Sequence, residues 1–229
     1  MRLGRNTIGT VAYLGGVPAL LEGFVWSWTQ LIQYNSLYLC GPGEEIRYER
    51  SKLSYHASAR NELAKNMRGD WLFMLDADHA FEADILARML NQMERLKVDV
   101  LSALYVNKAA PHEPQVYHWG EEQNLYARIV KWDTDDRIFR ADAVGAGTLL
   151  IKRSVFDRIE RELGEGPFSI MPPFSEDLSF CRRLMKLDIP LFIDPHIESL
   201  HLASYGVNYS MTPVEDLAVK DVLFRVEAR

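Results

Sequence analysis

The chain has 229 residues, a length that fits one large domain or two small ones. It is 48% hydrophobic and 25% charged, as in an ordinary globular protein. Its formal net charge of −6 makes a general attraction to nucleic acid or to anionic membranes unexpected, and no apolar run approaches the roughly 20 residues of a membrane span.

Cysteine usage and the N-terminus indicate the cellular compartment. Cys40 and Cys181 are the only two cysteines, so the sequence offers no disulfide framework and no cysteine-based metal cluster. Residues 1–5 are not followed by the apolar core of a signal peptide. We therefore expect a cytoplasmic protein.

The first half of the sequence alternates predicted strands and helices. In chain order, the apolar patterns predict a strand at residues 8–14, a helix at about 20–31, a strand at 37–40, a helix at about 57–67, a strand at 71–75, a helix at about 85–96 and a strand at 99–104. Such alternation favours a parallel, doubly wound sheet.

The second half begins with short strands that have no helices between them. The patterns predict strands at 116–119, 127–132 and 148–151, helices at about 153–163 and 176–187, and a strand at 191–193. The adjacent short strands indicate an antiparallel section. No linker or repeat divides the chain, so we expect one domain.

An acidic turn follows the most apolar predicted strand. Five apolar residues at 71–75 end in Asp76-Ala77-Asp78. In an extended chain, residues i and i+2 point the same way, so both carboxylates can reach one ligand beyond the carboxyl end of the strand. A divalent cation bridging to phosphate would relieve their repulsion. The alternative is an acidic turn that caps the next helix. By the same alternation, His79 points away and is left out of the site.

Four stretches in a fixed order carry a resemblance to a known family. They are Ala59-Arg60-Asn61 opening a helix, Asp76-Ala77-Asp78 after a strand, Ser175-Glu176-Asp177 opening a later helix, and His201. Over about residues 8–201, the chain resembles the GT-A glycosyltransferases, especially the small phage and bacterial proteins of glycosyltransferase family 2.

The resemblance implies one GT-A (Rossmann-like) α/β domain with a mostly parallel central sheet and a small antiparallel section. It implies a nucleotide-sugar-binding half at about residues 7–105 and an acceptor and catalytic half at about 106–203. Residues 204–229 would form a tail or lid. The implied activity is metal-dependent transfer of a sugar, typically a hexose, from a nucleotide-diphosphate sugar such as a UDP-sugar to an acceptor hydroxyl.

The resemblance also implies a metal site. Asp78 would bind the cation directly, Asp76 would bind the ribose hydroxyls or reach the metal through water, and His201 would be a further ligand. An imidazole ligand suits Mn²⁺ better than Mg²⁺. Taken alone, His201 is better explained as a partly buried, hydrogen-bonded histidine, and the ordered set of motifs reverses that preference.

Further residues are implied in donor binding. These are Tyr13, Arg60, Asn61, Asp76 and Gly147. Tyr13 lies near the end of the first predicted strand, where members of the family usually have a proline–threonine ending. Positive charge and amide donors at a helix start suit a phosphate or base, and a glycine lets the backbone approach a ligand. Arg60 could instead be a surface residue, and the glycine could mark a β-bulge.

Glu176 and Asp177 admit two interpretations. Ser175 is a good N-cap, and acidic residues in a first helical turn complement the helix dipole. In inverting members of the family, the second residue of this pair is the base that deprotonates the acceptor. Carried over, Asp177 is the catalytic base, and Glu176 is its neighbour in the acceptor pocket.

The acceptor and the competing activities stay open. The acceptor could be a polysaccharide, a small molecule or a modified DNA base. A DNA acceptor would use a local basic face formed by Lys108, Lys131, Arg137, Arg140, Lys152 and Arg153. The alternatives are a nucleotidyltransferase of related fold, whose basic glycine-rich loop is absent from residues 15–18, and a non-catalytic nucleotide-sugar-binding module.

Overall fold

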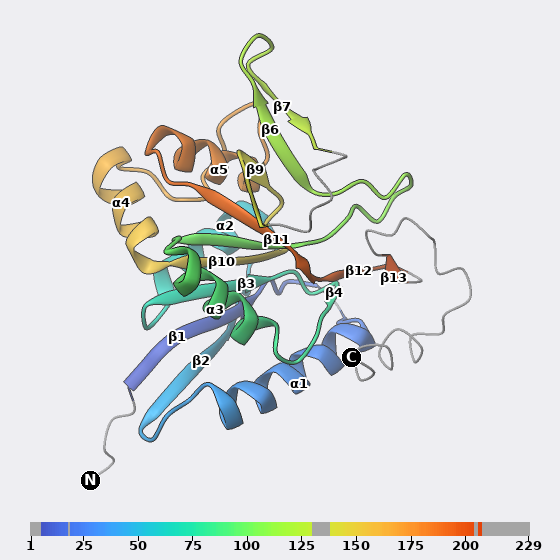
Figure 1. The fold of residues 1–229 in the computed structure, drawn as a ribbon, viewed down its shortest axis with the longest axis vertical. Coiled ribbons are helices and arrows are strands. Elements are labelled where there is room, and N and C mark those ends of the chain that lie inside the picture. Colours follow the sequence, from blue (N-terminus) through green and yellow to red (C-terminus); the bar gives the residue numbers. More distant parts are fainter. Residues whose placement is uncertain (1–5, 18, 130–137, 204–205, 208–229) are drawn as a thin grey trace.

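The computed structural model describes residues 6–17, 19–129, 138–203 and 206–207. Its centre is a seven-stranded sheet in the order β2-β1-β3-β10-β5-β11-β8. These strands are β1 (Asn6–Tyr13), β2 (Glu44–Arg50), β3 (Trp71–Leu75), β5 (Val100–Leu104), β8 (Phe139–Ala141), β10 (Thr148–Lys152) and β11 (Leu191–Glu198). Neighbouring strands are parallel except at β10 and β8, which run antiparallel to theirs. The predicted α/β class with a mostly parallel sheet is confirmed (Figure 1).

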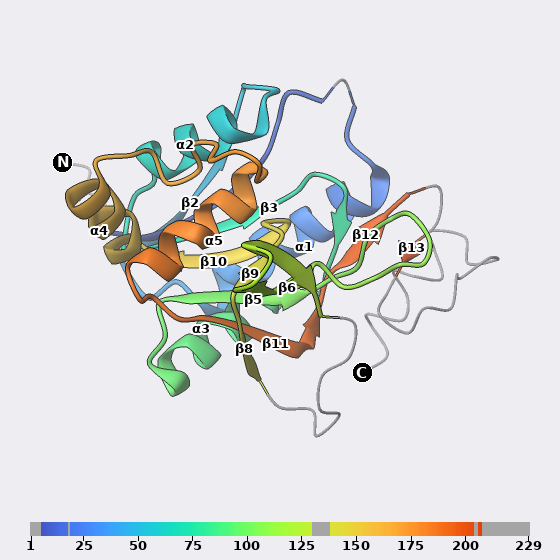
Figure 2. The same ribbon diagram turned by 90° about the horizontal axis from the view of Figure 1, so that it is seen from above.

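Helices cover both faces of this sheet. On one face pack α2 (His56–Asn66), α4 (Arg153–Leu163) and α5 (Glu176–Lys186). On the other face pack α1 (Glu22–Tyr38) and α3 (Ile85–Leu96). Figures 1 and 2 show these two layers on either side of the strands. The doubly wound arrangement therefore follows from the alternation read in the sequence.

The strand period of two divides the core into two clusters. In β3, Leu72 and Met74 point into the cluster under α2, α4 and α5, whereas Trp71, Phe73 and Leu75 point toward α1 and α3. All five are buried. This explains why a continuous apolar run forms a strand here.

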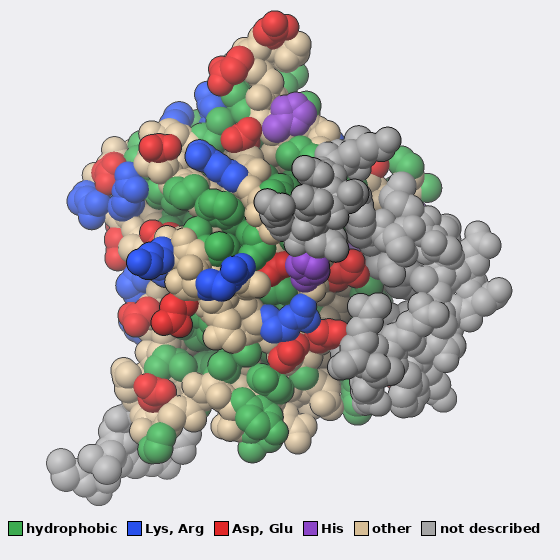
Figure 3. Space-filling model, viewed as in Figure 1, with side chains coloured by type: hydrophobic (Ala, Val, Ile, Leu, Met, Phe, Trp, Pro, Cys, Tyr) green, Lys and Arg blue, Asp and Glu red, His purple; other side chains and the backbone are tan. Residues whose placement is uncertain are grey.

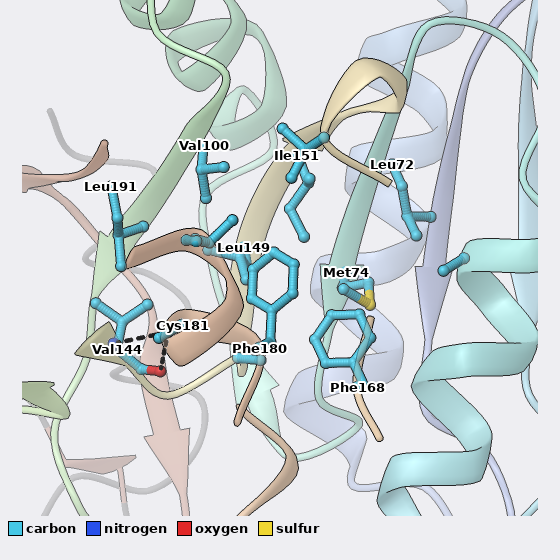
Figure 4. Close-up of a cluster of buried hydrophobic side chains, with 14 of the residues drawn as sticks. Leu72, Met74, Val100, Val144, Leu149, Ile151, Phe168, Phe180, Cys181 and Leu191 are labelled. Carbon is cyan, nitrogen blue, oxygen red and sulfur yellow. Dashed lines mark hydrogen bonds between the residues drawn. The ribbon is translucent and has the colours of Figure 1, made fainter. Parts of the chain in front are cut away.

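Aromatic stacking fills the first cluster. Phe168 and Phe180 stack with ring centroids 4.6 Å apart, and the Cys181 thiol lies against the backbone of Val144 (Figure 4). These contacts fix α5 against the sheet and so set the position of its N-terminus.

Two small antiparallel sheets lie beside the central one. The first contains β4 (His79–Ala80), β12 (Leu200–Leu202) and β13 (Gly206–Val207), and the second contains β6 (Val116–Gly120), β7 (Leu125–Arg128) and β9 (Ala143–Val144). The predicted antiparallel section in the second half is thus present. The predicted strand at 127–132 begins earlier, and its part beyond residue 129 lies outside the described residues.

The prediction of a strand at residues 37–40 is wrong. Residues 37 and 38 are the last two of α1, and they are exposed. The strand that follows is β2, after the break at Gly41-Pro42-Gly43. It carries mostly charged residues, and only Ile46 is buried, because it forms the edge of the sheet.

Two further expectations concern the ends of the chain and the membrane. A lid formed by residues 204–229 lies outside the described residues except for Gly206 and Val207, which pair with β12. Among the helices that the structure describes, none combines the length and apolarity needed to cross a bilayer.

Candidate functional site

Two histidines and an aspartate meet just beyond the carboxyl end of β3. The antiparallel pairing of β4 with β12 places His79 directly opposite His201, and their rings stack with centroids 4.6 Å apart. Asp78 Oδ2 lies 3.6 Å from His201 Nε2, and Asp78 Oδ1 lies 3.9 Å from His79 Nε2. One ligand atom from each of the three residues lies within 4.8 Å of the others. The structure therefore brings together Asp78 and His201, which lie far apart in the sequence.

The backbone and a serine orient both rings. His201 Nδ1 donates to the carbonyl oxygen of Val106 at 2.8 Å, and because a carbonyl can only accept, this nitrogen carries the proton. His201 Nε2 is then the ring nitrogen that faces Asp78. His79 Nδ1 lies 2.7 Å from the hydroxyl of Ser199, which turns His79 Nε2 toward Asp78 as well. Such outer hydrogen bonds are typical of histidines that bind metal ions.

Charge and burial set the protonation of this cluster. Burial lowers the pKa of His79 to about 3, so its ring is neutral near pH 7. Burial by itself would raise the pKa of Asp78, but hydrogen bonding to His201 and Lys108 and nearby positive charge hold that pKa well below its usual range. The Lys108 ammonium contacts Asp78 Oδ2 directly. The site thus combines an ionised carboxylate with neutral imidazole.

This donor set fits a divalent cation. Asp78 Oδ1 and His79 Nε2 are buried and have no hydrogen-bond partner in the described part of the chain. Unsatisfied buried polar atoms are costly, and a bound cation would satisfy both. One carboxylate and two imidazoles are ligands that transition-metal ions accept.

The expectation that His79 points away from Asp78 is wrong. Its basis was strand alternation, but residues 77 and 78 form a turn between β3 and β4, and alternation does not hold across a turn. The same turn separates the two carboxylates. Asp76 is not part of the three-residue cluster but faces Arg60.

Arg60 joins three segments of the chain. Its guanidinium lies 2.9 Å from Asp76 Oδ1, donates to the carbonyl oxygen of Ala146 at 2.9 Å and reaches Glu176 Oε1 at 3.3 Å. Its side chain is only 3% exposed. Burial would lower the pKa of Arg60, but the carboxylates of Asp76 and Glu176 outweigh it and raise that pKa. Arg60 is therefore an internal cation and not a surface arginine.

Asn61 faces a different segment from Arg60. Its side-chain oxygen accepts from the backbone N–H of Phe168 at 2.9 Å, and its amide nitrogen lies 3.5 Å from the hydroxyl of Ser169. Asn61 thus holds the loop that leads to α5. A part for it in nucleotide binding stays a prediction.

The glycines before β10 pack against rings of the site. A Cβ on Gly145 would lie 2.0 Å from the Tyr105 hydroxyl, and a Cβ on Gly147 would lie 2.8 Å from His79 Nε2. The N–H of Gly147 donates to the Tyr105 hydroxyl at 3.0 Å, and its carbonyl accepts from the N–H of Asp76 at 2.8 Å. Close approach of these rings already requires glycine, and a donor-binding role of Gly147 stays a prediction.

Asp177 lies in the first turn of α5. Its Oδ1 accepts from the Ser175 hydroxyl and, at 2.8 Å, from the N–H of Leu178. Burial, with the negative charge of Glu176 in addition, raises the pKa of Asp177. Ser175 occupies the N-cap position, yet its side chain makes no capping hydrogen bond. A raised pKa brings a carboxylate closer to what a general base needs near neutral pH.

Tyr13 lies at the end of β1 against an aromatic cluster. Its ring meets those of Phe24 and Trp28 edge-on, at centroid distances of 5.1 and 4.9 Å. Its neighbour Leu14 bonds to the carbonyl of Leu75 at the end of β3. Tyr13 is therefore half-buried at the same edge of the sheet as the acidic turn, and its role in binding stays a prediction.

Two of the basic residues that a DNA acceptor would use lie far apart in the structure. Lys152 pairs in register with Trp71 at the start of β3, whereas Lys108 contacts Asp78 in the acidic turn beyond the other end of that strand. The two ends of β3 are about 13 Å apart. Lys152 is bound to Asp99, and Arg153 to backbone carbonyls. Lys131 and Arg137 lie outside the described residues. On the face seen in Figure 3, the visible basic side chains are interspersed with acidic ones.

Comparison with known proteins gives a family and two structural neighbours. Residues 39–158, more than half of the chain, match the family model described as Glycosyl transferase family 2. No curated protein sequence matches the chain significantly. A solved structure of A197 from STIV has 15% identity and a TM-score of 0.59, with 89% of this chain and 91% of that chain covered.

The second neighbour is GalNAc-T7, solved with UDP, GalNAc and Mn²⁺. It has 13% identity and a TM-score of 0.57, and the alignment covers 97% of this chain and 48% of that one. This chain thus spans about half the length of the GalNAc-T7 chain. At these identities, both neighbours establish the fold and nothing finer.

Proposed function

The chain belongs to glycosyltransferase family 2 and has the GT-A fold, and from this premise we propose that it transfers a sugar from a nucleotide-diphosphate sugar to an acceptor hydroxyl with the aid of a divalent cation. The observation that carries the proposal is the contact of Asp78 with His201 beyond the carboxyl end of β3. Ligands bind at this end of the strands in open α/β sheets. The family match does not favour a nucleotidyltransferase or a non-catalytic binding module.

The donor binds at the edge where β1 and β3 end, within residues 7–105. The likeness to GalNAc-T7, which was solved with UDP and GalNAc, supports a UDP-linked hexose as donor. Asp76 remains 29% exposed, so its carboxylate can accept hydrogen bonds from ribose hydroxyls. Arg60 acts on the donor through Asp76, because its own guanidinium is already engaged on three sides.

Asp78 and His201 hold the cation, Mn²⁺ or Mg²⁺. A bound cation neutralises the charge that develops on the departing diphosphate. Lys108 contributes a second positive charge beside Asp78. His201 Nε2 is available as a ligand because Val106 fixes the proton on the other ring nitrogen.

Asp177 is the base, within the acceptor half at residues 106–203. It removes the proton of the acceptor hydroxyl, the acceptor oxygen bonds to the anomeric carbon, and the bond to the diphosphate breaks with its electron pair. Attack opposite the leaving group inverts the anomeric centre. Glu176 is held by Arg60 and is not free for this role, which leaves Asp177 as the carboxylate with a raised pKa.

The acceptor is a polysaccharide or a small molecule on this proposal. A modified base in DNA has less support, because Lys108 and Lys152 lie near opposite ends of β3. Uncharged hydroxyl acceptors need no basic face.

A donor panel with paired variants tests the proposal. UDP-, GDP-, CDP- and dTDP-sugars are screened with Mn²⁺ for thermal stabilisation and then for release of nucleoside diphosphate. Asp78→Ala is expected to lose both, whereas Asp177→Asn keeps the stabilisation and loses transfer. Asp157→Asn, at an exposed position on α4, is the control. Stabilisation by none of the donors, or turnover that Asp177→Asn leaves unchanged, would contradict the proposal.

A further inference from the structure

His79 has an imidazole nitrogen that nothing in the described protein uses. Its side chain is 0% exposed, and its Nε2 is one of four buried side-chain atoms without a hydrogen-bond partner among the described residues. A second of the four is Asp78 Oδ1, which lies 3.9 Å from it. Two buried polar atoms that face each other without hydrogen-bond partners are unfavourable, and a cation between them would satisfy both.

We propose that His79 Nε2 is a third protein ligand of the cation, beside Asp78 and His201, so that the site is built from one carboxylate and two imidazoles. This inference rests on the proposed metal dependence and extends it. Strand alternation in the sequence predicts that His79 points away from Asp78. The turn between β3 and β4 instead places the His79 ring beside Asp78.

The surroundings of His79 orient its ring toward Asp78. Ser199 Oγ lies 2.7 Å from Nδ1, and Thr148 Oγ1 lies 3.4 Å from the same nitrogen. Gly147 leaves the space that Nε2 occupies, since a Cβ there would come within 2.8 Å of it. The ring therefore has a hydrogen-bonded side and a free side, as in other histidines that bind metals.

The separation of the three side chains suits one ion. Ligand atoms on opposite sides of such an ion lie about 4 Å apart, and here the ligand atoms lie within 4.8 Å of one another.

Two imidazoles change the expected choice of metal. Mg²⁺ prefers oxygen ligands and retains several waters, whereas Mn²⁺, Co²⁺ and Zn²⁺ accept nitrogen. With His79 as a ligand, the site selects these ions over Mg²⁺ more strongly than a site with one histidine. The turn between β3 and β4 thus affects metal selectivity, because it places His79 beside Asp78.

Pulsed electron paramagnetic resonance on Mn²⁺ bound to the full chain tests this without measuring activity. The wild type is expected to show hyperfine couplings of Mn²⁺ to two imidazole nitrogens. The variants His79→Gln and His201→Gln are each expected to show coupling to only one. Mn²⁺ affinity by calorimetry is expected to fall at least about 10-fold in His79→Gln. His118→Gln, at an exposed histidine of β6, should match the wild type.

Ser199→Ala provides a second variant that keeps the ring. It removes the partner of Nδ1 and is expected to retain two nitrogen couplings with a roughly 10- to 100-fold weaker affinity. The wild-type nitrogen count needs no variant, so the test stands even if His79→Gln does not fold. One coupling in the wild type, from His201 alone, would overturn the role of His79 and leave the proposed metal site intact. Failure of the wild type to bind Mn²⁺ would instead overturn metal dependence itself.

Discussion

Arg60 and Asp76 form an ion pair 2.9 Å long in which the arginine is almost wholly enclosed by protein. The same guanidinium reaches Glu176 beside the proposed base and the carbonyl of Ala146 before β10. One buried cation thus sets the spacing between the donor edge of the sheet and the N-terminus of α5. Its removal takes the buried cation away from two partly exposed carboxylates, Asp76 at 29% and Glu176 at 13%, and from the carbonyl of Ala146.

Arg60→Ala is expected to lower the free energy of unfolding by about 2–4 kcal/mol, because it removes the hydrogen bonds of a buried guanidinium to two carboxylates and to a buried carbonyl. Denaturant unfolding followed by circular dichroism measures this loss. Arg161→Ala is the matched control, since Arg161 is 65% exposed in its pair with Glu162 and should change stability by less than about 1 kcal/mol. Equal losses in the two variants would show that Arg60 does not hold the site together.

Asp177→Asn is expected to reduce kcat by about 10²- to 10⁴-fold, the range for loss of a general base. In the wild type, kcat should fall as the pH drops through the pKa of Asp177, which burial raises above its ordinary value of 3.8. The variant should lose this acid limb. A pH profile of kcat over the acidic range checks both, and an acid limb that persists in the variant would assign the base elsewhere.

The same carboxylate has an opposite effect on stability. Its pKa is higher in the folded than in the unfolded chain, so ionising it costs folding free energy as the pH rises above the unfolded value. Asp177→Asn, which is uncharged at every pH, should therefore be at least as stable as the wild type at neutral pH. Thermal denaturation at acidic and neutral pH measures the difference.

Gly147→Ala is expected to displace the ring of His79 or of Tyr105, since its Cβ would lie 2.8 and 3.0 Å from their atoms. Overpacking of this kind costs about 1–3 kcal/mol, and it should also weaken Mn²⁺ binding. Gly164→Ala is the contrasting variant. It has no atom within 4 Å but a φ of +66°, so it should lose about 1–2 kcal/mol and keep Mn²⁺ affinity. Calorimetric titration with Mn²⁺ separates the two.

Cys181 is expected to resist alkylation in the native state. Burial raises the pKa of its thiol to about 12, so almost no reactive thiolate exists at pH 8. In a Cys40→Ser background, iodoacetamide should label the protein only after denaturant is added, which mass spectrometry can follow. Rapid labelling of the folded protein would mean that the packing around α5 opens readily.

Strongly patterned elements were predictable from the sequence. The apolar run of β3 and the periodic helices α3 and α4 have the predicted positions, because their burial follows directly from residue order. The acidic turn after β3 also identified the edge where Asp78 lies. The meeting of Asp78 with His201 needed the ordered family pattern, since it depends on a cross-strand pair formed late in the chain.

Elements that depend on distant partners were not predictable. β2 lacks an apolar pattern because it is an edge strand. The exposed apolar residues at the end of α1 were predicted to form a strand instead. The side on which His79 lies is decided by a turn that alternation cannot describe. The burial of Arg60 depends on Glu176, 116 residues further along. Each case is a contact between segments and not a property of one segment.

The position of β10 has a consequence for how the protein is made. Strands β3 and β5 are not hydrogen-bonded to each other, because β10 lies between them and bonds to both. A nascent chain that has left the ribosome only as far as residue 105 therefore has a gap in the middle of its sheet. The central sheet closes only when β10 is present, so we expect that residues 1–105 alone do not form the sheet of the full chain.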